Sequence, residues 1–410
     1  MNCGKDHDRI RTGRLTLNRR SAQSGFTMVE LVVGTFLASV ISLAVFAVFI
    51  DSGEYFGQQL DQTQAQSSLR FAMEYIKGDL HDFGRLSIQN TDLRVRDPNY
   101  CGVGQYQGVE LLDNDLGGDG YQPSEVLVRN NITPDRLRLL ADVSDATPLR
   151  VSRFNGTTIS LVHSLQQPTT EARRITGVGA ELRFAEMFDN ESLTRVTNVE
   201  TGRYDLVPTN DAQLINGVGR ITLAAPPCAS LGCASGTCIV NPVHRLEYLV
   251  LSQEEAQEHT YLARRRLNLN NNSPIPDSEL VIADYIVNFQ LWGQYDTKGQ
   301  AANAIGQPAI NLISFVPDDP SMKDDRGNWA PQVDESQRME MWSHRIRALN
   351  ILISARAARV DPNLKRQFNF ANFGPQERVT IDLLRSPSRG QAHVNSMIGA
   401  VDTANLYRGD

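Results

Sequence analysis

The sequence predicts an α+β protein in which a long N-terminal helix, membrane-spanning over its first half, packs on a β-rich globular head. Three observations lead to this prediction. Residues 26–50 form an apolar run whose one charged residue is Glu30. Apolar side chains then recur at helical spacing as far as Phe83, and no proline occurs before Pro98. Beyond residue 90, short stretches rich in β-branched and aromatic residues alternate with turn-forming residues, which is typical of strands.

The apolar run is long enough to cross a bilayer. As a helix, residues 26–50 would extend about 37 Å, which exceeds the roughly 30 Å hydrocarbon core and allows some tilt. The preceding 25 residues carry six basic and two acidic side chains. The positive-inside rule therefore keeps this leader in the cytoplasm and directs the rest of the chain outward.

Glu30 is the unusual feature of this run, because a charge within a membrane helix is costly and is taken as functional by default. A secretory signal peptide is one alternative, with a small-x-small cleavage site at residues 42–44. Apolar residues continue to Ile50, however, so that site would lie in mid-membrane. A plain single-pass anchor is the other alternative, and it gives Glu30 no role.

The segment SGFTMVEL at residues 24–31 resembles the processing site of type IV prepilins. In that family a glycine precedes an aromatic residue, and a glutamate is fifth in the mature chain. The resemblance implies that a prepilin peptidase cleaves after Gly25 and that Phe26 becomes the N-methylated terminus. Glu30 would lie about one helical turn from the new amine. We expect its carboxylate to neutralise the amine of a neighbouring subunit and to set register during assembly.

The second half of the helix is expected to be amphipathic. Its apolar stripe predicts packing against the protein's own sheet. The stripe consists of Leu69, Met73, Ile76, Leu80 and Phe83, with Gly84 as the expected stop. The expected organisation is a prepilin leader at 1–25, a transmembrane and assembly helix at 26–50, a periplasmic amphipathic half at 51–88, a β-rich head at 89–385 and a C-terminal tail at 386–410.

The head is expected to be built from short strands. These are residues 93–95, 125–129, 136–140, 158–162, 181–185, 219–224, 245–251, 260–267, 280–283 and 286–292. Residues 343–355 alternate polar and apolar side chains and form a long strand candidate. The spacing of Ile346, Leu349 and Ile353 also fits a helix. The sequence after Arg385 shows little periodicity, which favours a mobile tail.

Several segments of the second half resemble the minor-pilin family called PilW. They are RLEYLV at 245–250, YLARRR at 261–266, VIADYIVNFQL at 281–291, RIRALNILI at 345–353 and the glycine-aspartate turn leading into a strand at 120–129. The chain departs from the family at Glu125, where an aspartate is expected, so we assign that residue no role.

The PilW resemblance implies a type IV pilin-like fold and a function in type IV pilus assembly, as a minor pilin of a priming or tip complex. The implied partners are other minor pilins, the major pilin, the prepilin peptidase, the pilus assembly platform and the inner membrane. Before assembly the chain would cross the inner membrane once with a periplasmic head, and afterwards it would lie in the pilus, at its tip.

Two other functions are compatible with the same features. The J-type pseudopilin of type II secretion shares much of the pattern, and a tip adhesin or DNA-uptake module would carry a similar helix. The net charge of −7 becomes more negative without the leader, which argues against a general nucleic-acid partner. The seven histidines fall in no catalytic or metal-ligand motif. We therefore expect neither an enzyme nor a cofactor.

Four cysteines remain once Cys3 leaves with the leader. An even number in an exported chain favours disulfides, and four cysteines allow three connectivities. A structural zinc site that includes His244 and free thiols are the alternatives, although the cysteine spacing is wider than in zinc knuckles. The four are Cys101, Cys228, Cys233 and Cys238.

Two charged segments complete the candidate sites. Asp113, Asp115 and Asp119 occupy the first, third and seventh positions of an EF-hand-like loop, but Ser124 stands where the bidentate acid is needed. A polar turn is expected there, with calcium as the alternative. The run of three arginines at 264–266 is expected to be solvated or paired with acids, and a functional basic patch is the alternative.

Overall fold

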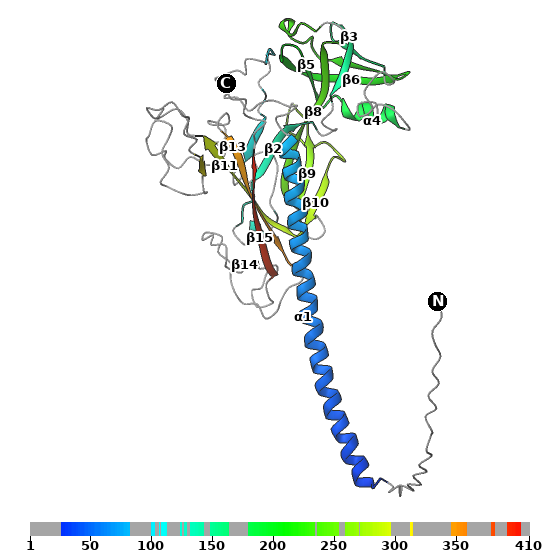
Figure 1. Ribbon diagram of the computed structural model, residues 1–410, viewed down its shortest axis with the longest axis vertical. Helices are drawn as coiled ribbons and strands as arrows, with labels where there is room; N and C mark the ends of the chain where they lie inside the picture. Colours follow the sequence, from blue (N-terminus) through cyan, green and yellow to red (C-terminus); the bar gives the residue numbers. More distant parts are fainter. Residues whose placement is uncertain are drawn as a thin grey trace, which may run out of the picture. The chain divides into compact units, whose positions relative to one another are not determined.

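The computed structural model describes residues 26–82, 100–102, 106, 108–112, 124, 127–128, 132–142, 148–163, 179–233, 236–253, 259–269, 271–296, 312–314, 346–358, 379–381 and 392–402. The chain divides into two compact units, Met1–Gly57 and Gln58–Asp410. Helix α1, Met28–Asp82, runs through the boundary between them (Figure 1). Each unit is described by itself below.

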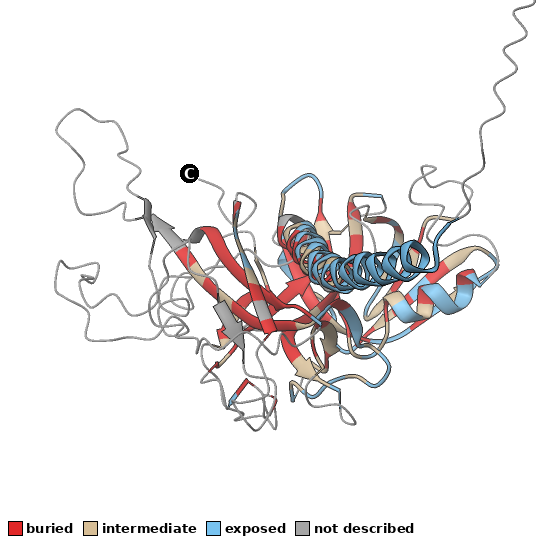
Figure 2. Cartoon of the chain, turned by 90° about the horizontal axis from the view of Figure 1, so that it is seen from below, coloured by how far each residue is buried: buried red, intermediate tan, exposed pale blue. Residues whose placement is uncertain are grey.

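In the first unit, α1 is exposed on every side. All residues from Phe26 to Asp51 are exposed, including large side chains such as Phe36 at 66% and Phe46 at 71% (Figure 2). Among the described residues, α1 is the one helix that is long and apolar enough to cross a membrane. The predicted long apolar helix is therefore confirmed. It ends at Asp82, and the expected stop at Gly84 lies outside the described residues.

In the second unit, the last part of α1 is the centre of a hydrophobic core. The predicted stripe is buried at Leu69, Met73, Ile76 and Leu80. These side chains share one cluster with apolar residues of two different sheets, among them Leu246, Phe289 and Ile351. The prediction that the stripe packs on the protein's own sheet is confirmed for these four positions.

Five antiparallel strands form the first sheet, in the order β1-β2-β8-β9-β10. Strand β8 lies at its centre and extends beyond it. Four of the five correspond to predicted strands, which β8 extends at both ends. The strands are β1 (Val109–Leu112), β2 (Arg136–Ala141), β8 (Cys238–Ser252), β9 (Thr260–Leu267) and β10 (Leu280–Asp284).

The first half of β8 also closes a ring of six antiparallel strands, in the order β8-β3-β4-β7-β6-β5 and back to β8. Apolar side chains of the ring share a separate core. Strand β8 therefore joins ring and sheet as one continuous element. The other ring strands are β3 (Leu149–Asn155), β4 (Thr158–Leu161), β5 (Leu193–Asn198), β6 (Tyr204–Ile215) and β7 (Val218–Leu223).

The predicted strand at 181–185 is wrong, because these residues belong to helix α4, Ala180–Met187. Phe184 and Phe188, four residues apart, are both buried in the ring core, whereas Leu182, two residues before Phe184, is exposed. This is helical periodicity, which a five-residue window did not reveal. The lack of a side chain at Gly219 of β7 leaves space for α4, since a Cβ there would lie 2.7 Å from Phe184 Cζ.

The second sheet has the order β12-β11-β13-β15-β14. Its strands are β11 (Ile286–Asp296), β12 (Leu312–Ser314), β13 (Ile346–Arg356), β14 (Val379–Ile381) and β15 (Ala392–Asp402). Residues 346–355 therefore form a strand and not a helix.

The expectation of a tail after Arg385 is wrong for residues 392–402, which form β15. This strand pairs with β13 from Val394 to Asp402. Its polar and small residues hide the alternation in the sequence. Gly399 lies against α1, where a Cβ would come within 2.7 Å of Met73 Sδ. Residues 392–402 thus belong to the head.

A row of alternating charges crosses the first sheet. Glu110, Arg138, Glu247 and Arg265 are successive Cα partners on β1, β2, β8 and β9. The Glu247 carboxylate is fully buried and accepts bonds from Arg138 Nε at 2.9 Å and Arg265 Nε at 2.8 Å. Arg136, also fully buried, donates to the same carboxylate at 3.1 Å. One buried anion therefore holds three guanidinium groups.

We expect Glu247→Gln to destabilise the head strongly, because three arginines would lose their shared anion. Breaking a buried ion pair costs about 3–5 kcal/mol. Denaturant unfolding of the full chain in detergent measures the effect. Glu200→Gln, at an exposed position of the β5–β6 turn, is the matched control. Equal stability of the two variants would contradict this account.

Candidate functional site

The N-terminus of α1 is closed by a reciprocal pair of side chains. Glu30 Oε2 accepts bonds from the Thr27 backbone N–H and from Thr27 Oγ1, both at 2.9 Å. The Glu30 N–H in turn donates to Thr27 Oγ1 at 3.3 Å. This is a capping box. Thr27 is not among the predicted site residues, although threonine three residues before glutamate at the start of an apolar run is the signal for a capping box.

The cap leaves Phe26 and Glu30 accessible, the residues predicted for processing and for assembly. Phe26 is 85% exposed, and Glu30 is exposed beside it. Both bonds from Thr27 end on Oε2, so Oε1 can accept a bond from a further donor. The structure thus places Phe26 and Glu30 together at the helix start. Gly25, the expected cleavage position, lies outside the described residues.

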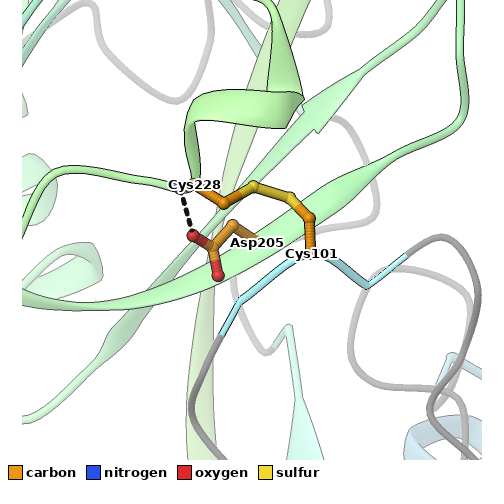
Figure 3. A group of neighbouring side chains, drawn as sticks. All are labelled: Cys101, Asp205 and Cys228. Atoms are coloured by element: carbon orange, nitrogen blue, oxygen red, sulfur yellow. Dashed lines mark hydrogen bonds between the residues drawn. A yellow bond between two sulfur atoms is a disulfide. The ribbon is translucent and has the colours of Figure 1, made fainter.

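The four cysteines are joined in two disulfides, Cys101–Cys228 and Cys233–Cys238, with Cα atoms 5.9 Å and 5.6 Å apart. Figure 3 shows the first of them beside Asp205. The first crosslink ties the chain after α1 to the loop between β7 and β8. Within the described part of the chain, the group with metal-ligand spacing is Cys101, Cys228 and Asp205, and it does not include His244.

Asp205 is a buried carboxylate on β6, with 5% of its surface exposed. Its Oδ2 accepts a hydrogen bond from the Cys228 N–H and its Oδ1 accepts one from the Leu206 N–H, both at 2.8 Å. Burial raises the pKa of the Asp205 carboxyl, and the two N–H donors oppose that rise. Gly102 makes room for the group, since a Cβ there would lie 2.0 Å from Oδ1. No spacing in the sequence links residue 205 to either cysteine.

The three consecutive arginines are paired with acids, so they do not form the basic patch considered as an alternative. Arg265 belongs to the charge row, and Arg266 Nη2 pairs with Asp189 Oδ2. Arg264 Nη1 lies 2.8 Å from Asp79 Oδ2 of α1.

Asp79 also accepts a hydrogen bond from the hydroxyl of Tyr248. Two side chains of the sheet, Tyr248 and Arg264, therefore bind this carboxylate of α1. Burial raises the pKa of Tyr248 well above its usual value, and the negative charge of Asp79 adds to the rise. The pair Asp79–Arg264 and the Tyr248 hydroxyl fasten the last turns of α1 to β8 and β9.

His244, considered above as an alternative zinc partner, is instead a buried side chain in the middle of β8. Burial lowers its pKa to about 3, and the positive charge of Arg266 adds to the effect. The calcium candidates Asp113, Asp115 and Asp119 lie outside the described residues.

The two disulfides are expected to differ in what they contribute to stability. Loop-closure entropy predicts a loss of about 5 kcal/mol for Cys101→Ala/Cys228→Ala, whose ends are 127 residues apart. The Cys233–Cys238 disulfide joins cysteines only five residues apart, so Cys233→Ala/Cys238→Ala should cost about 2 kcal/mol. Denaturant unfolding of both variants measures the difference, and the reverse order would contradict this pairing.

His244 should make the head sensitive to acid. Its folded pKa lies below the unfolded value of 6.5, so its contribution to stability is complete above pH 6.5 and declines as the pH falls toward 3. Between pH 7 and pH 5 the loss is about 2 kcal/mol. His244→Gln should lose less stability over that interval, because it cannot take up the proton. Identical pH dependence in both proteins would contradict a neutral buried His244.

Comparisons with known proteins returned no relative for this chain. No protein-family model, no curated protein and no solved structure matches it.

Proposed function

We propose that the chain is a minor pilin that enters a type IV pilus through α1, as part of a priming or tip complex. The observation that carries the proposal is the exposed, membrane-length apolar helix with Glu30 in its first turn. The SGF sequence directly before it supports a mature chain that begins at Phe26. This combination gives an assembly helix its two requirements, an apolar surface and a charge close to a new amine.

The apolar surface needs a nonaqueous environment at every stage. In the bilayer, lipid covers it, and in a filament the helices of neighbouring subunits do so. Transfer between these environments leaves apolar burial nearly unchanged. The charge pair then decides the register, because a terminal amine and a carboxylate that are both desolvated are stable only side by side. Glu30 Oε1 is available for this amine while Oε2 stays on Thr27.

The size of the head supports a place at the end of a pilus. Beside the first sheet, the head contains a closed strand ring and a second sheet, which also packs on α1. These additions widen the subunit around its helix, and a repeating shaft has little space for them. A place in the tip or priming complex needs one copy and no lateral repeat.

The two functions of Glu30 can be separated by substitution. Glu30→Gln preserves the capping box, since glutamine serves at that position, but removes the charge. Thr27→Ala removes the cap and preserves the charge. We expect the Gln variant to insert in the membrane at the normal level and to fall at least tenfold in purified pili. The Ala variant should lose helix stability of about 1 kcal/mol and still be incorporated.

Quantitative immunoblotting of membranes and sheared pili measures both variants against the wild type. Normal incorporation of Glu30→Gln, with loss for Thr27→Ala, would show that Glu30 serves as a cap only. Deletion of the gene should lower the number of surface pili. Unchanged pili with lost protein secretion would identify a pseudopilin, and unchanged pili with lost attachment or DNA uptake would identify a tip module.

A further inference from the structure

The group formed by Cys101, Cys228 and Asp205 has a composition that the pilus function does not explain. The two sulfur atoms and a carboxylate oxygen all lie within 4.8 Å of one another (Figure 3). They come from three separate parts of the chain: the segment after α1, strand β6 and the loop after β7. We propose that in its reduced state this group binds one divalent ion of the zinc class, and that formation of the disulfide prevents this binding.

Asp205 is the first argument for a cation. A buried carboxylate is normally paired with a positive group, because its desolvation is costly. Each of its oxygens instead accepts one hydrogen bond from a neutral backbone N–H, at 2.8 Å. Those two bonds fix the orientation of the carboxylate and leave a lone pair on each oxygen. The carboxylate is thus preoriented for a metal, as ligands held by a hydrogen-bonded outer shell are.

The geometry of the cysteines is the second argument. Zinc binds sulfur at about 2.3 Å and carboxylate oxygen at about 2.0–2.2 Å, so tetrahedral ligand atoms lie roughly 3.5–3.8 Å apart. The Cα atoms of Cys101 and Cys228 are 5.9 Å apart. Once the disulfide is broken, rotation of the two side chains separates the sulfurs to this range. Two thiolates and one carboxylate would fill three positions, and water would fill the fourth.

The chemistry makes the two states exclusive. A phosphine reductant breaks the sulfur–sulfur bond by giving two electrons to the disulfide. One water molecule supplies the oxygen of the resulting phosphine oxide and the protons of the two thiols left on the protein. Each thiol then releases a proton as its thiolate binds the metal. A sulfur atom in the disulfide is not a thiolate, so it cannot bind the metal as a thiolate ligand. Bound metal in turn keeps both thiolates from reoxidising, so the ion and the crosslink compete for the same atoms.

Cobalt(II) is the probe, because thiolate ligation gives it a strong near-ultraviolet charge-transfer absorption. The test uses the full chain in detergent, carrying Cys233→Ser/Cys238→Ser and reduced with a phosphine. We expect one equivalent of cobalt to bind with that absorption. Adding Asp205→Asn should weaken binding at least tenfold. The reciprocal variant, Cys101→Ser/Cys228→Ser, keeps the other cysteine pair and should bind at least tenfold more weakly.

Failure of the proposal is equally visible. Absence of the thiolate band, equal binding after Asp205→Asn, or unfolding of the reduced chain without cobalt binding would each overturn it. A second measurement uses the reduced wild-type chain with zinc and a cysteine alkylating agent. Zinc should protect Cys101 and Cys228 more than Cys233 and Cys238, and uniform alkylation would overturn the proposal.

Discussion

The exposed apolar surface of α1 is the constraint on which the rest of the molecule depends. A helix with every side chain from Phe26 to Asp51 exposed cannot remain in water, because burial of apolar area is the main source of protein stability. This surface therefore needs a nonaqueous environment, which a membrane can supply. In the proposed pilus, the helices of neighbouring subunits would replace the lipid. In the proposed assembly, Glu30 would add selectivity to this general attraction, since a desolvated charge tolerates only a neighbour that supplies its counter-ion. The capping box at Thr27 keeps that carboxylate at the helix start.

Side-chain contacts attach the head to the last turns of α1. Asp79 accepts bonds from Tyr248 and Arg264, so a helix carboxylate is fastened to two neighbouring strands. Strand β8 carries this attachment into the sheet, where Glu247 holds three arginines, and onward into the strand ring. The Cys101–Cys228 crosslink provides a second, covalent connection to the ring.

Much of this architecture could be predicted from the sequence, and the failures have identifiable causes. The long helix, its buried stripe and strands such as β9 and β13 follow from strong periodicity. Helix α4 was mistaken for a strand because only Phe184 and Phe188 reveal its apolar face. Strand β15 was missed because small and polar residues dilute its alternation.

The sites were predictable only where the signal is local. The Thr27–Glu30 cap can be read from four neighbouring residues. The partners of the first disulfide could not be predicted, because the fold brings Cys101 and Cys228 together across 127 residues of chain. The position of Asp205 beside them follows from the fold alone, since no spacing in the sequence links it to either cysteine. The same holds for Asp79 and Arg264, which pair across the helix–sheet contact.

The central claim is that Glu30 serves a terminus created by cleavage after Gly25. Mass spectrometry of the N-terminal peptide from the purified chain tests it most directly. The account predicts a peptide that begins at Phe26 and carries one methyl group on its amine. A chain that begins at Met1, or after residues 42–44 as a signal peptide would require, would contradict it.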